Sequence, residues 1–166
     1  MNATPIRRDP RVNLDPPEEY RESIGEMVMR LSRLDYQLGV IARVASNLSK
    51  ADQRRLFFKL RGDRLCDALE LLAVSIKSKT LAAEVRELAR NSARLNERRN
   101  DFVHSVYGDL ENAPGVMMRF RLATPKQGQD IVAAPASAAE MQQFIEEISD
   151  AQNRAEELTR KVKDYP

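Results

Sequence analysis

The sequence predicts an all-α protein built as an antiparallel four-helix bundle, with a small β-hairpin inserted before the last helix. Apolar residues recur at spacings of three and four over several long segments, the pattern of amphipathic helices that share a core. Aromatic residues make up only 5% of the chain, which has no Trp and six Gly, a composition typical of helical folds. One short segment alternates with period two instead, which indicates the hairpin.

A chain of 166 residues fits a single folded domain. Residues 1–16 carry prolines and charges without hydrophobic periodicity, so we expect a disordered N-terminal tail. Residues 17–166 form the helical domain, with the hairpin insertion at about 115–134. The start of the chain lacks an apolar signal core, and no apolar run approaches the ~18 residues of a membrane span. We therefore expect a cytoplasmic protein with no membrane association.

The first predicted helix runs from Pro17 to about Asn47. Pro17 suits a first helical turn, and the glutamates that follow it complement the helix dipole. Its apolar stripe consists of Ile24, Met27, Val28, Leu31, Leu34, Leu38, Ile41 and Ala45. The connection at 48–62 has a less regular pattern, in which Ser49 or Asp52 could cap a short helix.

The second predicted helix spans 63–77, and the third runs from an N-cap at Thr80 to about Val106. The stripe of the third helix is Val85, Leu88, Ser92, Leu95, Arg99, Phe102 and Val106. Arg99 stands where this pattern requires an apolar residue, and such inconsistencies are frequent at functional sites. Cys66, on the second helix, is interpreted as a small buried hydrophobe.

The hairpin and the last helix complete the domain. Apolar residues alternate with others from Val116 to Leu122, as in a half-buried strand, and Ile131 and Val132 can pair back after a turn at 124–129. Ser137 and Glu140 form a capping box for a last helix that reaches about Lys163.

The net charge and the residues that can bind ligands limit the range of possible functions. The net charge of +2 is too small to indicate nucleic-acid binding by field strength alone. The chain nevertheless has 20 Arg against 7 Lys. This bias fits either a phosphate or RNA ligand, which arginine binds in bidentate fashion, or a GC-rich genome. With one Cys and one His, a single chain offers no zinc or iron site, so we expect neither metal nor cofactor.

The segment 95–107 carries the residues best suited to catalysis, namely the only histidine, His104, with Arg98, Arg99 and Asn100 just before it. Cleavage of RNA through its own 2′-hydroxyl needs a base for that proton, an acid for the leaving 5′-oxygen, and positive charge on the phosphorane. A free histidine, with a pKa near ~6.5, can perform either proton transfer near neutrality. A guanidinium can bind the non-bridging oxygens.

The pattern Arg99-Asn100-x-x-x-His104, near the end of a late helix, resembles the Rx4–6H signature of the HEPN superfamily, in which a polar residue commonly follows the Arg. The resemblance in arrangement covers roughly residues 17–164. It implies a homodimer in which two motifs meet in a cleft, and a metal-independent endoribonuclease of toxin–antitoxin, phage-defence or RNA-processing systems. His104 would be the general acid or base, Arg99 the phosphate and transition-state ligand, and Asn100 a positioning residue.

Helix geometry qualifies this assignment. On a straight helix Arg99 and His104 point about 140° apart, whereas Asn100 and His104 share a face. Arg99 must therefore curl round, or the helix must change course, or Arg98 or a partner chain must contribute. Since one chain has one histidine and a symmetric dimer has two, we expect a site shared across the two-fold axis.

The same helix carries a ridge of four arginines, Arg86, Arg90, Arg94 and Arg98. Like charges four residues apart cost a few tenths of a kcal/mol per pair, so the ridge could serve to guide an RNA backbone. The alternative is a solvated face moderated by nearby glutamates. Tyr107, placed one helical turn after His104, would support RNA binding or simply be a boundary aromatic.

Two functions stay open at this point. The first is an endoribonuclease, as a toxin or defence component that an antitoxin or another protein partner could control. The second is a non-catalytic HEPN-like dimerisation or adaptor module that binds a protein or RNA partner. The identity of the RNA, and whether the hairpin covers the cleft, do not follow from the sequence.

Overall fold

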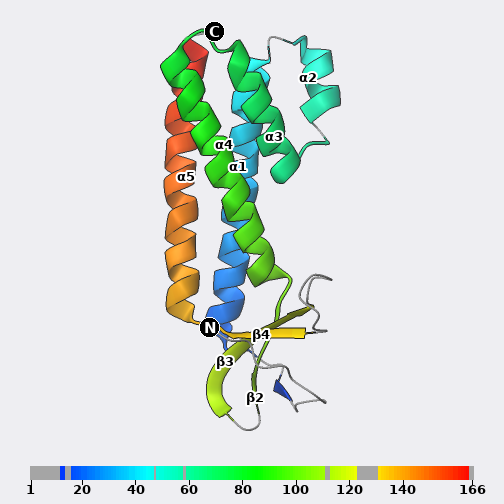
Figure 1. The fold of residues 1–166 in the computed structure, drawn as a ribbon, viewed down its shortest axis with the longest axis vertical. Helices are drawn as coiled ribbons and strands as arrows, with labels where there is room; N and C mark the ends of the chain where they lie inside the picture. Colours follow the sequence, from blue (N-terminus) through cyan, green and yellow to red (C-terminus); the bar gives the residue numbers. More distant parts are fainter. Residues whose placement is uncertain are drawn as a thin grey trace.

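The chain is mostly helical, with a small antiparallel sheet at one end (Figure 1). A computed structural model describes residues 12–13, 16–46, 48–57, 59–110, 113–122 and 131–164. The helices are α1 Glu18–Ala45, α2 Lys50–Phe57, α3 Asp63–Leu72, the 3-10 turn η1 Ala73–Ser75, α4 Lys79–Val103 and α5 Ala138–Asp164. The strands are β1 Val12–Asn13, β2 Val106–Leu110, β3 Ala113–Leu122 and β4 Ile131–Pro135.

Three long helices, α1, α4 and α5, lie side by side, and α3 packs against α1 and α4 in the upper half of Figure 1. Their apolar faces enclose the core. The largest fully buried side chains are Phe102, Phe144, Met27, Leu34, Leu38, Ile41, Leu65, Leu69, Met141, Ile148, Leu158 and Val85. All of them except Leu65 and Leu69 on α3 come from the three long helices, because apolar residues spaced three and four apart share a helix face.

The first and last predicted helices are confirmed with small shifts of their ends, and the connection at 48–62 contains the short helix α2. Ser49 caps α2, since its hydroxyl accepts a hydrogen bond from the backbone N–H of Asp52 at 3.2 Å. Ser137 does the same for α5, where its hydroxyl accepts the N–H of Glu140 at 3.4 Å. That bond confirms one half of the predicted capping box.

The predicted cap of the third helix, Thr80, is wrong. Helix α4 begins two residues earlier, and the Ser78 hydroxyl accepts the N–H of Leu81 at 3.3 Å. Ser78 has the extended backbone of an N-cap, with φ −75° and ψ 113°, which leaves its side chain free to fold back over the first turn. The second helix is also shorter than predicted, because α3 ends at Leu72 and passes into η1.

The predicted end of the third helix at Val106 is also wrong. Helix α4 ends at Val103, His104 follows as its C-cap, and Val106 opens β2. Strand β2 pairs antiparallel with β3, with Val106 opposite Phe120. Local helical spacing does not reveal that Val106 belongs to a strand, because its partner Phe120 lies fourteen residues further along the chain. The sheet therefore begins before the predicted insertion at 115–134.

The sheet has the order β1-β2-β3-β4 within the described residues. The predicted return strand is confirmed, because β3 pairs with β4 in the register Arg121 to Val132. The predicted turn at 124–129 lies outside the described residues. So does most of the predicted tail at 1–16, although Val12 and Asn13 form β1 and pair with β2.

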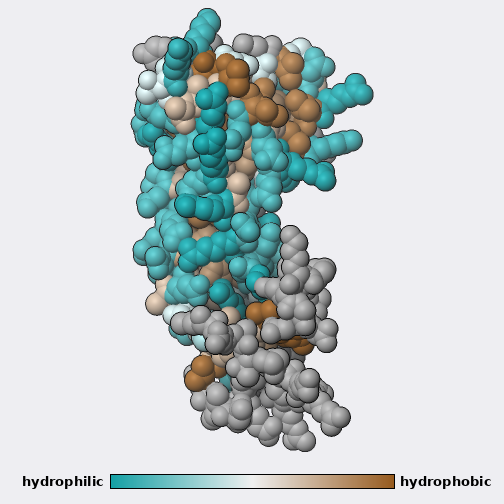
Figure 2. Space-filling model, viewed as in Figure 1, coloured by the Kyte–Doolittle hydropathy of each residue, from teal (hydrophilic) through white to brown (hydrophobic). Residues whose placement is uncertain are grey.

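The surface is largely hydrophilic along the long helices, whereas hydrophobic residues gather near the upper end, over α2 and α3 (Figure 2). Leu71 and Val74 are the most exposed of these, at 76% and 72%. No helix in the described ranges is long and apolar enough to cross a membrane.

Candidate functional site

The His104 side chain lies exposed at the junction between α4 and the sheet. As the C-cap it has left the helical conformation, with φ −97° and ψ 9°. Its backbone N–H still donates to the carbonyl of Asn100 at 3.2 Å, which ties it to the last helical turn. The neighbouring Ser105 hydroxyl donates to the carbonyl of Asp101. His104 is therefore held at the end of α4, and its ring is exposed to solvent.

The Arg99 side chain is half-buried, and its Nε is buried without a hydrogen-bond partner among the described residues. Burial raises the pKa of Asp35, a half-buried carboxyl on α1, and the positive charge of Arg99 is one of the influences that oppose this rise. The polar break in the α4 stripe thus lies close enough to a carboxylate of α1 to affect its pKa.

Asp35 is a residue that sequence reasoning missed. Desolvation raises its pKa above the ordinary value of 3.8, while a hydrogen bond from the Gly62 N–H and the charges of Arg61 and Arg99 oppose that rise. The Gly62 N–H donates to Asp35 Oδ2 at 3.3 Å. Gly62 has φ +52°, a backbone region that favours glycine. The signal in the sequence is a carboxylate at the edge of the first stripe, opposite in charge to Arg99.

Asn100 lines a different surface from Arg99. It borders a hollow of about 900 Å³ between α4, α5 and β3. The lining residues are Arg94, Leu95, Glu97, Arg98, Asn100, Asp101, Arg121 and Glu147. Neither Arg99 nor His104 is among them. Within one chain the structure therefore brings Asn100 together with Arg94 and Arg98, and leaves the three predicted catalytic residues without a common cleft.

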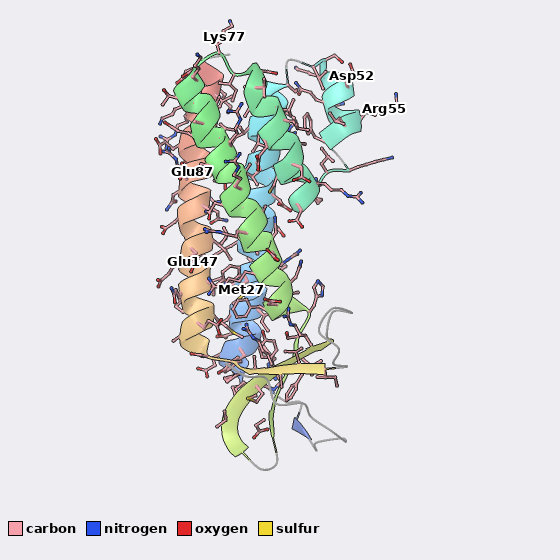
Figure 3. The ribbon with its side chains drawn as sticks, viewed as in Figure 1. Met27, Asp52, Arg55, Lys77, Glu87 and Glu147 are labelled. Carbon is pink, nitrogen blue, oxygen red and sulfur yellow. The ribbon has the colours of Figure 1, made fainter. Side chains whose placement is uncertain are left out.

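Arg98 is held by neighbouring side chains. Its Nη1 donates to both carboxylate oxygens of Glu147 at 2.8 Å each, and Figure 3 labels Glu147 on α5. Its guanidinium also lies 4.8 Å from the ring centroid of Phe144, whose ring stacks on Phe102 at 5.2 Å. A salt bridge and a cation–π contact together fix the side chain between two helices. Arg98 thus joins α4 to α5.

Three of the four ridge arginines, Arg90, Arg94 and Arg98, have carboxylate or amide partners. Arg90 pairs with Glu70 at 3.2 Å, and Arg94 donates to Asn91 at 2.7 Å. The hollow of about 900 Å³ contains three arginines and three acidic residues among its lining. A second hollow, of about 600 Å³ between α4 and α5, is also balanced three to three. The ridge therefore presents no excess of positive charge in these two hollows.

Tyr107 is not one helical turn after His104, because it belongs to β2. Its side chain is buried, and its hydroxyl donates to the carbonyl of Phe102 at 2.8 Å. Burial raises its pKa to about 12. Because the hydroxyl is already used inside the fold, this position favours the alternative of a structural aromatic over a residue that supports RNA binding.

Two further features could support reactive chemistry, namely the thiol of Cys66 and a cluster of metal-binding side chains. Cys66 is buried as predicted, and burial raises the pKa of its thiol to about 12, which disfavours the reactive thiolate. Among the residues with described positions, no three His, Cys, Asp or Glu side chains gather as a metal ion would require.

Comparison with known proteins adds no relative. No family model matches the chain. No curated protein and no solved structure matches it either. The resemblance to the HEPN superfamily accordingly rests on the motif and its helical setting alone.

Proposed function

We propose that this chain is a HEPN-like, metal-independent endoribonuclease that acts as a homodimer. In this proposal α1, α3, α4 and α5 are the four helices of the bundle, and the motifs of two chains meet across the two-fold axis. The observation that carries the proposal is His104, an exposed imidazole anchored at a helix end through Asn100. An enzyme that cleaves RNA near neutral pH needs an accessible proton-transfer group of this kind.

Each site residue has its own role in the proposed cleavage reaction. The imidazole of His104 accepts the proton of the 2′-hydroxyl, whose oxygen attacks the adjacent phosphorus and displaces the 5′-oxygen. The second His104, from the partner chain, protonates that leaving oxygen, so that a 2′,3′-cyclic phosphate results. Arg99 binds the non-bridging oxygens and stabilises the charge that builds on them. Asn100 positions His104, because its backbone carbonyl accepts a hydrogen bond from the His104 N–H.

A second function is favoured by the pairing of the arginines. Arg98 is engaged by Glu147, and the charge of Arg99 lies close enough to Asp35 to affect its titration. Arginines that neutralise carboxylates inside one chain serve the fold and are less free to bind phosphate. The alternative is a non-catalytic HEPN-like module that dimerises and binds a protein or RNA partner. A cytoplasmic toxin or phage-defence setting, with a protein antitoxin, belongs to the first proposal.

Cleavage of a structured RNA in EDTA separates the two functions. The wild-type chain should cut the RNA and leave 2′,3′-cyclic ends, whereas His104→Ala should lose at least about 100-fold in rate, as expected for removal of a general acid or base. Asn153→Ala, an exposed polar residue on α5, is the matched control and should cut like the wild type. Circular dichroism establishes that each variant is folded.

Equal rates for the wild type and His104→Ala would reject the enzyme, because the only histidine would then be dispensable. Absence of cleavage by the wild type, with a stable dimer in light scattering, would favour the adaptor module.

A further inference from the structure

A third hollow, of about 360 Å³, lies between α1, α2 and the loop that precedes α3. Its lining residues are Ser32, Asp35, Tyr36, Gly39, Arg43, Arg54, Phe57 and Arg61. Three arginines face one carboxylate there, which leaves an excess of two positive charges. The two hollows along α4 are each balanced three to three. The positive excess is thus found on the α1 side of the molecule and not along the α4 ridge.

The three arginines keep donor groups available. Arg54 is exposed and makes no ion pair within the described ranges. Arg43 donates its Nε to the carbonyl of Gly39 at 3.0 Å, which leaves both terminal nitrogens of its guanidinium. Arg61 donates one terminal nitrogen, Nη1, to backbone carbonyls, at 2.8 Å to that of Leu60. Guanidinium groups with unused N–H donors are the usual protein ligands of phosphate oxygens.

An aromatic ring stands beside these arginines. Tyr36 is 67% exposed, an unusual exposure for a tyrosine inside a long packed helix. The Arg43 guanidinium lies 5.9 Å from the centroid of that ring. A flat ring flanked by guanidinium groups is the arrangement on which nucleobases stack in single-strand-binding proteins.

Gly39 provides the open space of the hollow. It lies in the interior of α1, where glycine disfavours the helix relative to alanine. A Cβ on Gly39 would meet no atom within 4 Å, so packing does not require the glycine. The absent side chain leaves open space at the hollow, and the Gly39 carbonyl accepts a hydrogen bond from Arg43 Nε.

We propose that this hollow binds a nucleoside phosphate, either free or as one nucleotide of single-stranded RNA. The base would stack on Tyr36, and Arg43, Arg54 and Arg61 would bind the phosphate. The Asp35 carboxylate would accept a hydrogen bond from a ribose hydroxyl or a base amino group. Small-molecule sites measure about 300–1,000 Å³, so the hollow accommodates a single nucleotide. The proposal concerns binding and stands without any RNA cleavage.

Calorimetric titration of the full chain tests this site with four probes: adenosine 5′-monophosphate, adenosine, inorganic phosphate and a ten-residue oligoadenylate. We expect saturable binding of the monophosphate, with adenosine and inorganic phosphate each at least about tenfold weaker. If RNA is the natural source, the oligoadenylate should bind more tightly than the monophosphate; if a free nucleotide is, it should not.

Two pairs of variants locate the binding. Arg54→Ala should weaken monophosphate binding by about tenfold, whereas Arg55→Ala should change it less than twofold. Both are exposed arginines of α2, but Arg55 is not part of the lining and lies on the outer side of the helix (Figure 3). Gly39→Leu should abolish binding by filling the hollow, while Gly25→Leu, at another open glycine of α1, should not.

Equal losses from Arg54→Ala and Arg55→Ala would overturn the site, and so would undiminished binding by Gly39→Leu. If inorganic phosphate bound as tightly as the monophosphate, the hollow would be a simple anion site and Tyr36 would have no role in binding. Because these readouts measure binding, their failure is distinct from a failure of RNA cleavage.

Discussion

Arg99 and Asp35 interrupt the apolar patterns of two facing helices. Each would be costly to bury alone, since an uncompensated charge in a protein interior loses its hydration. The Gly62 N–H donates a hydrogen bond to the Asp35 carboxylate, and the positive charge of Arg99 on α4 favours its ionised form, beside the proposed nucleotide site. The sequence pattern revealed one half of this arrangement, because Arg99 stands inside a stripe. A carboxylate at the edge of the first stripe is visible in the sequence, but that Asp35 lies near Arg99 depends on how the helices pack.

The raised pKa of Asp35 predicts a pH dependence of stability. A carboxyl whose pKa is higher in the folded than in the unfolded protein binds protons more tightly in the folded state. The free energy of unfolding should therefore fall as the pH rises from about 3.8 through the raised value, and stay lower above it. Asp35→Asn, which does not titrate, should lack this fall. Urea unfolding at several pH values gives the free energy of unfolding of both proteins. The same pH dependence in both would contradict the raised pKa of Asp35.

Tyr107→Phe tests the hydrogen bond that anchors the start of the sheet. It removes the donor to the Phe102 carbonyl and leaves that buried acceptor unsatisfied, which should cost about 1 kcal/mol of unfolding free energy. Tyr36→Phe is the control at an exposed tyrosine and should change stability by less than about 0.5 kcal/mol. Equal effects in chemical denaturation would mean that the Tyr107 bond contributes nothing.

At the scale of elements, the helices followed from the sequence and the sheet followed only in part. The stripes of α1, α4 and α5 are long enough that their period identifies them. Strand β2 is five residues long, and its first residue, Val106, also continues the helical spacing of α4, so that spacing carries the predicted third helix three residues too far. The consequence reaches the site, because His104 lies at a helix end and Tyr107 points into the fold.

The start of α4 offers a direct test of capping. Ser78→Ala removes the side-chain acceptor of the Leu81 N–H and should lower the unfolding free energy by about 1 kcal/mol. Thr80→Ala, two residues further on and exposed, should change it by less than about 0.5 kcal/mol. Chemical denaturation of the two variants decides between them. A larger loss from Thr80→Ala would return the helix start to the residue that the sequence pattern favoured.

At the scale of the molecule, the fold distributes the arginine and carboxylate side chains in a way that the amino-acid composition does not reveal. The α4 arginines lie among carboxylates of α3, α4 and α5. By contrast, Arg43, Arg54 and Arg61, which are not evenly spaced along one helix, come together at the hollow between α1 and α2. A ridge on one helix is readable from spacing alone. The pairing of two of its arginines, Arg90 and Arg98, with Glu70 and Glu147 depends on the neighbouring helices, which only the fold provides.

The central claim, a site that two chains share, is tested most directly by mixing wild-type chains with inactive His104→Ala chains. Equal amounts of the two are refolded together and assayed for RNA cleavage in EDTA beside the same total amount of wild-type chain. Random pairing gives about a quarter of the dimers two wild-type chains and about half of them one. Because the proposed reaction uses both His104 side chains, only dimers with two wild-type chains should cleave, and we predict about a quarter of the wild-type activity. About half of the wild-type activity would mean that each chain acts alone and would contradict the shared site.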